Sequence, residues 1–321
     1  MRLLVTGGAG FIGSNFVRHM LDNYDYEIVV LDALTYSGNR NNLPNHPNLF
    51  FYHGDIRNPE AVNNLMQNCQ AVVHFAAESH VDRSIQDATP FVSTNVLGTQ
   101  VLLDAAVKHN ISKFVHISTD EVYGSVDENM RILDETFTES SMLNPTSPYA
   151  SSKASSDLIV QSYHKTFGLN TIITRSSNNY GQYQYPEKFI PLMITNAFMG
   201  KKLPLYGTGD NRREWIHVED NCRAIDKVLH EGTVGDIYNI STEVGSSNRD
   251  ILYMILAIMD KPEDMIENVT DRLAHDFEYA VATEKIFNDT GWSPTITIDD
   301  GMVQTINWYL DNVNWWENLK K

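Results

Sequence analysis

Tyr149 and Lys153 stand four positions apart in the stretch Pro148-Tyr149-Ala150-Ser151-Ser152-Lys153, which is expected to begin a helix. Side chains four apart on a helix share one face, so the phenol and the ammonium would point the same way. A phenol titrates at about pH 10 in water, and a neighbouring cation favours its ionised form. Lowering that pKa by roughly three units takes about 4 kcal/mol of differential interaction. The pair therefore predicts a base at neutral pH, although the spacing taken alone is more typical of a solvated surface pair.

Two adjacent carboxylic side chains, Asp120 and Glu121, follow a strand expected over residues 114–118. In a parallel sheet, ligands bind at the carboxyl ends of the strands. If one side chain is held protonated as an acid while the other is an ionised base, the two divide the work that elimination of water requires. The other interpretation of the same residues is a solvated strand end.

The segment Thr6-Gly7-Gly8-Ala9-Gly10-Phe11-Ile12-Gly13 follows the first expected strand and opens a helix. Its glycines suit a tight turn, a close approach of backbone N–H groups to a pyrophosphate, and close packing of helix on strand. Asp32 closes the second strand 19 residues after Gly13, where a carboxylate would accept hydrogen bonds from a ribose and repel a 2′-phosphate. These features predict NAD rather than NADP, and a nicotinamide cation would add to the effect of Lys153 on Tyr149.

The elements that would position these groups are short apolar runs that alternate with helix-sized amphipathic stretches. The runs cover residues 3–6, 28–31, 49–52, 71–75, 114–118 and 171–174. This alternation indicates βαβ units and a parallel sheet covered by helices on both faces. We therefore expect an α/β fold with a doubly wound parallel Rossmann sheet and a smaller C-terminal substrate-binding lobe. Residues 1–177 would form the NAD-binding domain and 178–321 mainly the smaller lobe, while segments around 207–241 would return to the first sheet.

In this order, the glycine turn, the Thr119-Asp120-Glu121 triplet and the Tyr149/Lys153 pair resemble the extended short-chain dehydrogenase/reductase family, and within it the dTDP-glucose 4,6-dehydratases. The resemblance covers almost the whole chain and implies that residues 178–321 form mainly a nucleotide-sugar-binding lobe. It implies that Thr119 hydrogen-bonds the sugar, that Asp120 is the general acid and that Glu121 is the general base. It also implies that Tyr149 takes the proton of the 4-hydroxyl, while Lys153 binds the nicotinamide ribose. The implied activity is a lyase of deoxysugar biosynthesis that oxidises C4, eliminates water across C5 and C6, and returns hydride to C6.

The resemblance further implies two sets of binding residues. Those for NAD are Gly7, Gly10, Phe11, Ile12, Gly13, Asp32, Leu34, Thr35, Asp55, Ile56, Phe75, Ala76, Ala77, Ser79, Thr94, Tyr149, Lys153 and Asn179. Those for the nucleotide sugar are Ser79, Thr119, Asn178, Lys188, Phe189, Pro204, Tyr206, Arg213, Asn248, Arg272 and His275. Lys188, Arg213 and Arg272 would supply the cations that a diphosphate needs. Gln182, Glu214, Ala274 and Glu278 depart from the family pattern, which leaves thymidine and uridine nucleotides both open.

Composition limits the partners. The 321 residues are 42% hydrophobic, which is enough for a sizeable core, and the net charge of −17 disfavours nucleic acid and anionic membrane surfaces. The two cysteines, Cys69 and Cys222, have no disulfide-scaffold or metal-site spacing, so we expect no metal. The glycine turn so near the first residue leaves no room for a signal peptide, and no apolar run approaches about 18 residues. We expect a soluble, cytoplasmic protein.

Two other functional interpretations remain. A 4-epimerase or a UDP-sugar dehydratase would use the same glycine turn and the same Tyr149/Lys153 pair, but an epimerase has no use for Asp120 and Glu121. A non-catalytic NAD-binding sensor would keep the glycine turn and could lose the Tyr149/Lys153 pair. Because family members are commonly homodimers, the resemblance implies a homodimer packed through helices such as those after Pro90 and Tyr149.

Overall fold

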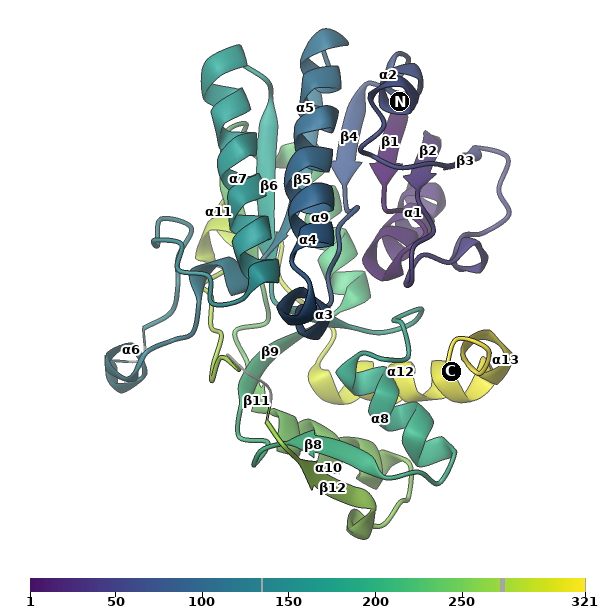
Figure 1. Cartoon of the computed structure of the whole chain (residues 1–321), viewed down its shortest axis with the longest axis vertical. Coiled ribbons are helices and arrows are strands. Elements are labelled where there is room, and N and C mark those ends of the chain that lie inside the picture. The colour runs from purple at the N-terminus through teal and green to yellow at the C-terminus, as the bar shows by residue number, and fades with distance from the viewer. Residues whose placement is uncertain (134, 272–274, 321) are drawn as a thin grey trace.

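The computed structural model describes residues 1–133, 135–271 and 275–320 (Figure 1). Its centre is a seven-stranded parallel sheet in the order β10-β6-β5-β4-β1-β2-β3. The strands are β1 (Arg2–Thr6), β2 (Glu27–Asp32), β3 (Leu49–His53), β4 (Ala71–His74), β5 (Lys113–Thr119), β6 (Thr171–Ser176) and β10 (Ile237–Ile240). The predicted doubly wound parallel sheet is confirmed.

Helices cover both faces of this sheet (Figure 1). The helices on one face are α1 (Phe11–Asn23), α9 (Val218–Glu231) and α11 (Glu284–Thr290), and those on the other are α2 (Pro59–Met66), α5 (Thr99–Lys108) and α7 (Pro148–Phe167). Successive side chains of a strand point to opposite faces. Leu3 and Val5 of β1 therefore pack in the first core, whereas Leu4 packs in the second. Double coverage explains why these strands read as continuous apolar runs.

A second group of elements forms a smaller lobe below the sheet in Figure 1. Its strands are β7 (Asn178–Tyr180), β9 (Arg212–His217) and β11 (Gly245–Ser247) in one sheet, and β8 (Leu203–Tyr206) and β12 (Ile266–Val269) in another. Its helices are α8 (Phe189–Phe198), α10 (Asn248–Ile258), α12 (Ile298–Asp311) and α13 (Val313–Trp316). They enclose a core of their own around Ile194, Ile255 and Ile306. Within residues 207–241, β10 joins the large sheet and α9 packs on its face, whereas β9 belongs to the three-stranded sheet of the smaller lobe. The domain boundary at residue 177 stays a prediction.

Short helical segments connect these elements. They are η1 (Arg40–Asn42), α3 (Val81–Gln86), α4 (Thr89–Phe91), the π-helical η2 (Val92–Gly98), η3 (Asp120–Tyr123), α6 (Glu128–Leu133) and η4 (Glu263–Met265). The strand order reverses between β1 and β4, which is where open α/β sheets bind ligands. None of the helices in the described ranges is long and apolar enough to cross a membrane.

Two local features place the predicted chemistry at this edge. Ser147 caps α7 by accepting a hydrogen bond from Ala150 N, and Pro148 is the first residue of the helix. Tyr149 therefore lies in the first turn of α7. β5 continues one residue beyond the expected 114–118, to Thr119, and the chain then turns into η3. Asp120 and Glu121 therefore lie on a short helical turn just past the strand end, close to the first turn of α7.

Candidate active site

The glycine turn brings backbone close to backbone, as a pyrophosphate site requires. Gly7 has φ +69°, and a Cβ there would lie 2.5 Å from Ala76 N. That position is therefore closed by the backbone that follows β4. A Cβ on Gly13 would collide with Gly7 O, so a side chain there would push α1 away from the turn. Gly10 precedes α1 without a capping side chain, which leaves the N-terminal N–H groups available. This geometry fits an anion at the helix N-terminus.

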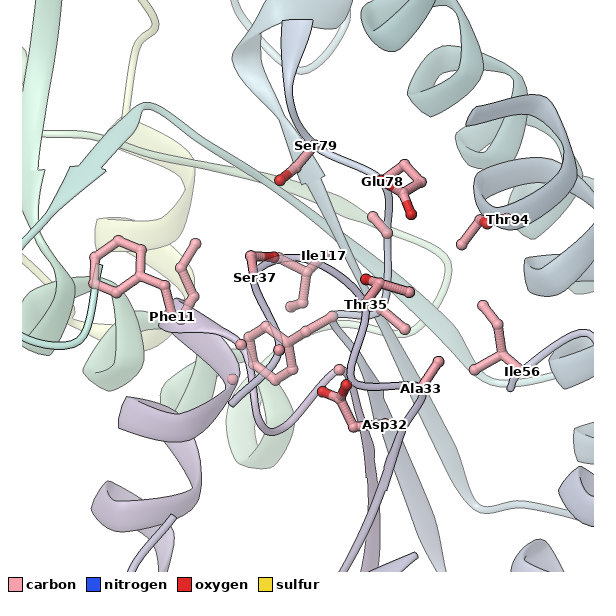
Figure 2. A pocket seen from close by; sticks show the side chains of 18 of the residues that line it. Phe11, Asp32, Ala33, Thr35, Ser37, Ile56, Glu78, Ser79, Thr94 and Ile117 are labelled. Atoms are coloured by element: carbon pink, nitrogen blue, oxygen red, sulfur yellow. The ribbon is translucent and has the colours of Figure 1, made fainter. Parts of the chain in front are cut away.

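A cavity of about 290 Å³ opens above this turn (Figure 2). Figure 2 shows Phe11 and Asp32 on its wall, with Ser79 on the segment after β4. The predicted NAD-binding residues that line it are Gly7, Gly10, Phe11, Ile12, Gly13, Asp32, Thr35, Asp55, Ile56, Phe75, Ala76, Ala77, Ser79, Thr94, Tyr149 and Lys153. The motifs thus converge on one space although they come from four different strand ends and two helices.

Two predicted cofactor residues lie outside that wall. Leu34 adopts φ +48° and donates its N–H to Asp32 Oδ1 at 2.8 Å, so its backbone orients the carboxylate. Asn179 donates Nδ2 to Ser177 O, and its buried Oδ1 has no hydrogen-bond partner in the described part of the chain. The sequence motifs missed several wall residues: Ser37, Gly38, Arg57, Glu78, Gln184 and Tyr185. Most stand beside predicted positions, so nearness in sequence was the available signal.

Asp32 is 8% exposed at the end of β2. Burial raises its pKa, and hydrogen bonds from Leu34 N and from Ala9 N, the latter at 2.9 Å, oppose the rise. Each of these bonds uses one acceptor position on a different carboxylate oxygen. Asp32 also lines the cavity, where its remaining acceptor positions suit the hydroxyls of a ribose. The residues present therefore fit NAD.

Lys153 reaches the cavity from α7 with its side chain almost fully buried. Its Nζ donates to Ile117 O at 2.6 Å, which leaves two of the three ammonium donors for a ligand. Burial lowers the pKa of Lys153 to about 8, and the negative charge of Asp157 opposes that fall.

Tyr149 differs from the expectation in one respect. Burial raises its pKa well above the ordinary value, and the carboxyl groups of Glu121 and Asp120 raise it further. The ammonium of Lys153 is directed at Ile117 O, so it does not outweigh these effects. Lowering the pKa of Tyr149 therefore requires positive charge beyond that of the chain, such as the nicotinamide cation that the sequence argument included.

Asp120 carries the clearest electrostatic signal at the site. It is 2% exposed, and its Oδ2 has no hydrogen-bond partner among the described residues. Burial raises its pKa well above the usual range, and the charges of Glu121 and Glu214 add to the rise. Thr119 Oγ1 donates to Asp120 Oδ1 at 3.2 Å and accepts from Glu121 N at 3.3 Å, which fixes the turn. Burial and the neighbouring charges both favour the protonated form of Asp120, which is the form that a general acid beside Glu121 needs.

The predicted nucleotide-sugar residues fall into two places. Ser79 and Lys188 line the cavity, where Lys188 Nζ donates to Ser79 O at 3.1 Å. In the smaller lobe, Phe189 stacks on Trp215, and His275 lies 6.2 Å from the ring of Tyr206 and bonds Asp271. Thr119, Asn178, Pro204 and Asn248 lie at the end of β5, on β7, on β8 and at the start of α10. Arg272 lies outside the described residues.

Arg213, one of the predicted diphosphate-binding residues, is buried and hydrogen-bonded to backbone carbonyl groups. It is 4% exposed, donates to the carbonyl groups of Arg212, Asp276 and Phe277, and its guanidinium lies over the ring of Tyr279 at 4.4 Å. These contacts tie β9 to the segment 276–279. A contact between Arg213 and a phosphate stays a prediction.

Glu214 gives a stability prediction. Burial raises its pKa from 4.5 to about 7, against hydrogen bonds from Ser241 Oγ at 2.6 Å and Val281 N at 3.2 Å. Between these two pH values the folded chain holds a proton that the unfolded chain releases, so stability falls as pH rises through that window, by about 3 kcal/mol in all. Glu214→Gln is therefore expected to raise the melting temperature above about pH 7 and to change it little near pH 5.

The check is thermal unfolding across this pH range, with Glu128→Gln on α6 as a surface control that should leave the profile unchanged. If Glu214→Gln lowers the melting temperature equally at both ends of the range, burial of the charge is not what limits stability.

Comparison with known proteins gives a consistent assignment. Residues 4–305 match the family model described as GDP-mannose 4,6 dehydratase. A dTDP-glucose 4,6-dehydratase of Streptomyces niveus is 48% identical, over 100% of this chain and 96% of the relative. The low-salt glycan biosynthesis protein Agl12 of Haloferax volcanii is 52% identical, over 97% of this chain and 99% of the relative.

Solved structures agree with these relatives. The crystal structure of DesIV, a dTDP-glucose 4,6-dehydratase from Streptomyces venezuelae with NAD and TYD bound, superposes with a TM-score of 0.95 at 49% identity, covering 99% of this chain and 100% of that one. A UDP-glucose 4-epimerase of Thermotoga maritima superposes with a TM-score of 0.91 at 25% identity, covering 98% of this chain and 100% of that one. The resemblance inferred from the motifs is confirmed, and the chain belongs to the GDP-mannose 4,6 dehydratase family.

Proposed function

We propose that this protein is an NAD-dependent lyase that converts dTDP-glucose to dTDP-4-keto-6-deoxyglucose. One observation carries the proposal: Tyr149 lines the NAD-fitting cavity and also lies close enough to Asp120 and Glu121 for their charges to raise its pKa. A group suited to oxidation and a pair suited to elimination therefore meet at one place. The similarity to dTDP-glucose 4,6-dehydratases of known sequence and structure supports this choice of reaction.

The chain's residues divide the reaction between them. The glycine turn, Asp32 and Lys153 would hold NAD, which supplies the acceptor and later the donor of hydride. Tyr149 takes the proton of the 4-hydroxyl as C4 becomes a ketone. A proton on C5 is acidic only next to that ketone, so oxidation must come first. Glu121 then removes the C5 proton, and Asp120 protonates the 6-hydroxyl, which leaves as water.

The assay for this function is product formation from dTDP-glucose and, in parallel, UDP-glucose. We expect the 4-keto product, which is followed by its absorbance in alkali, from dTDP-glucose in preference to UDP-glucose. An inverted sugar formed without loss of water would identify a 4-epimerase instead. Absence of turnover with both substrates, in protein shown to contain NAD, would contradict the proposed reaction.

Bound NAD is a prediction that can be checked without substrate. Because the cofactor is regenerated in every cycle, it need not leave, and we expect denatured protein to release NAD. Asp32→Ala removes the carboxylate that would bond the ribose, and we expect it to weaken NAD binding roughly 10- to 150-fold, since hydrogen bonds to charged groups contribute about 1.5–3 kcal/mol. Turnover that depends strictly on added NADP would contradict the role given to Asp32.

We further propose a homodimer that buries the outer surface of α5 and α7. The two helices pack side by side on one face of the sheet (Figure 1). Leu97, Leu158 and Phe167 are more than half exposed on or beside them. Light scattering should give twice the chain mass, and Leu158→Asp should give the monomer, whereas Val244→Asp, at an exposed position of the smaller lobe, should not.

The cysteines fit the expected compartment. Cys69 and Cys222 are both buried and unpaired, so neither takes part in a disulfide within the chain. Free thiols of this kind suit a reducing environment, and we propose that the enzyme works in the cytoplasm.

A further inference from the structure

A buried polar cluster lies behind the cavity, on the side of α7 that faces the sheet. Asp157 follows Lys153 by one helical turn and is fully buried. Arg175 of β6 donates Nε to Asp157 Oδ2 at 2.9 Å, and His116 Nε2 of β5 lies 3.5 Å from Asp157 Oδ1. None of the three lines the cavity, so the mechanism above does not use them.

The cluster holds more positive than negative charge. Burial lowers the pKa of His116 to about 4, and the charge of Lys153 lowers it further, so the imidazole is neutral. Burial and nearby positive charge likewise hold the pKa of His74 of β4 well below its usual range. Two cations, Lys153 and Arg175, therefore share the single carboxylate of Asp157.

Asp157 differs from the other charged groups around Lys153 in the group on which its charge acts. The titratable groups on the elements around Lys153 are His74 (β4), Asp82 and Arg83 (α3), Asp104 and Lys108 (α5), Lys113 and His116 (β5), Asp120, Glu121 and Tyr123 (η3), Tyr149, Asp157, Tyr163, His164 and Lys165 (α7), and Arg175 (β6). The charges of Asp120 and Glu121 act on Tyr149, and Asp104 accepts a hydrogen bond from Tyr163 further along α7. Among the described residues, Asp157 is the carboxylate whose charge acts on Lys153.

We propose that Asp157, fixed by Arg175, is a positioning residue that keeps the buried ammonium of Lys153 charged. Burial disfavours a charged amine, so a lysine at this depth needs a compensating anion. Holding the anion one helical turn behind the lysine leaves the cavity side of the ammonium to the ligand. The inference rests on the proposed function, because a charged Lys153 matters only where Tyr149 must lose a proton.

A purely structural role explains the cluster less well. Buried ion pairs are often replaced by apolar side chains without loss of stability, so packing alone does not call for charges here. A second nitrogen of Arg175 is also bonded, because Nη1 donates to Tyr123 OH at 2.9 Å and Tyr123 OH donates to Asn239 Oδ1 at 2.8 Å. The carboxylate is thus anchored on an arginine that is itself held in place from β6 and η3.

The test is the pH dependence of kcat/KM for dTDP-glucose with the NAD-loaded enzyme. Activity should fall at high pH as Lys153 loses its proton. Asp157→Asn should move that upper limb to lower pH by about one unit or more, which is a roughly tenfold loss at pH values above both midpoints. Asp157→Glu should restore the limb toward the wild-type position.

Tyr123→Phe is the matched control. It removes a hydrogen bond from the same cluster but keeps the carboxylate, so its upper limb should coincide with that of the wild type. Because Asp157→Asn leaves Arg175 as a buried unpaired cation and can fail to fold, the double variant Asp157→Asn/Arg175→Gln removes both charges together. The double variant should shift the limb in the same direction by a smaller amount, because loss of the Arg175 cation partly offsets loss of the carboxylate.

The outcomes separate cleanly. A folded Asp157→Asn or double variant whose upper limb stays at the wild-type pH overturns the proposal, as does an equal loss of rate at every pH. A shift in Tyr123→Phe as large as that in Asp157→Asn also overturns it. Lack of dehydration by the wild-type enzyme would instead refute the proposed function.

Discussion

Tyr149→Phe is expected to slow oxidation at C4 by roughly a hundred- to ten-thousandfold, the usual contribution of a general base. The ring remains, so the wall of the cavity keeps its shape, and only the group that takes the proton of the 4-hydroxyl is lost. Rapid mixing with substrate, with reduction of the bound cofactor followed by absorbance, measures this step directly.

Tyr163→Phe is a control on the same helix. Its hydroxyl bonds Asp104 away from the cavity, and its loss should leave oxidation unchanged. Lys153→Ala should impair the same step as Tyr149→Phe, since it removes the cation that favours the phenolate. Near wild-type oxidation in either Tyr149→Phe or Lys153→Ala would show that another group is the base.

Asp120→Asn and Glu121→Gln are expected to spare oxidation and to slow loss of water by a hundredfold or more, the order expected for an acid or base in the transition state. An amide at position 120 cannot protonate the departing hydroxyl. An amide at position 121 cannot remove the C5 proton. Single-turnover measurements should therefore show rapid oxidation followed by slow appearance of the 4-keto-6-deoxy product.

Deuterium at C4 of the substrate provides an independent check of the same assignment. The label should appear at C6 of the same molecule, and one solvent hydrogen should enter at C5. Mass spectrometry that found the label released to solvent, or retained at C4 of an inverted sugar, would exclude the assigned order of steps. Glu128→Gln on α6 is a control that should affect neither oxidation nor elimination.

The sequence predicted best what depends on neighbouring residues. The glycine turn, the end of β2 at Asp32 and the start of α7 at Tyr149 follow from local rules of strand, turn and helix, and the structure has them where those rules place them. Their meeting in one cavity follows from the parallel sheet, because all its strands end at the same edge.

Contacts between distant segments could not be predicted in this way. The cluster behind Lys153 joins β5, β6 and α7, and neither His116 nor Arg175 carries a recognisable motif. Arg213 donates to carbonyl groups of Asp276 and Phe277, which lie more than 60 positions away, and no motif around Arg213 indicates these contacts. The pKa of Tyr149 depends on burial and on carboxyl groups from another element, which spacing along one helix does not reveal.

α9, β10 and α11 come from the C-terminal part of the chain, and this affects how the chain folds during synthesis. The core on their face of the large sheet combines Val5 and Ile172 with Tyr238, Ile286 and Trp292. During synthesis, α1 covers only part of that face, and the rest stays uncovered until the last of these residues has been made. A fragment that stops near residue 177 would expose the apolar side of β5 and β6 and tend to aggregate. The large sheet, whose first strands are made early, is therefore expected to be completed only near the end of synthesis. Until then the nascent chain is expected to depend on chaperones.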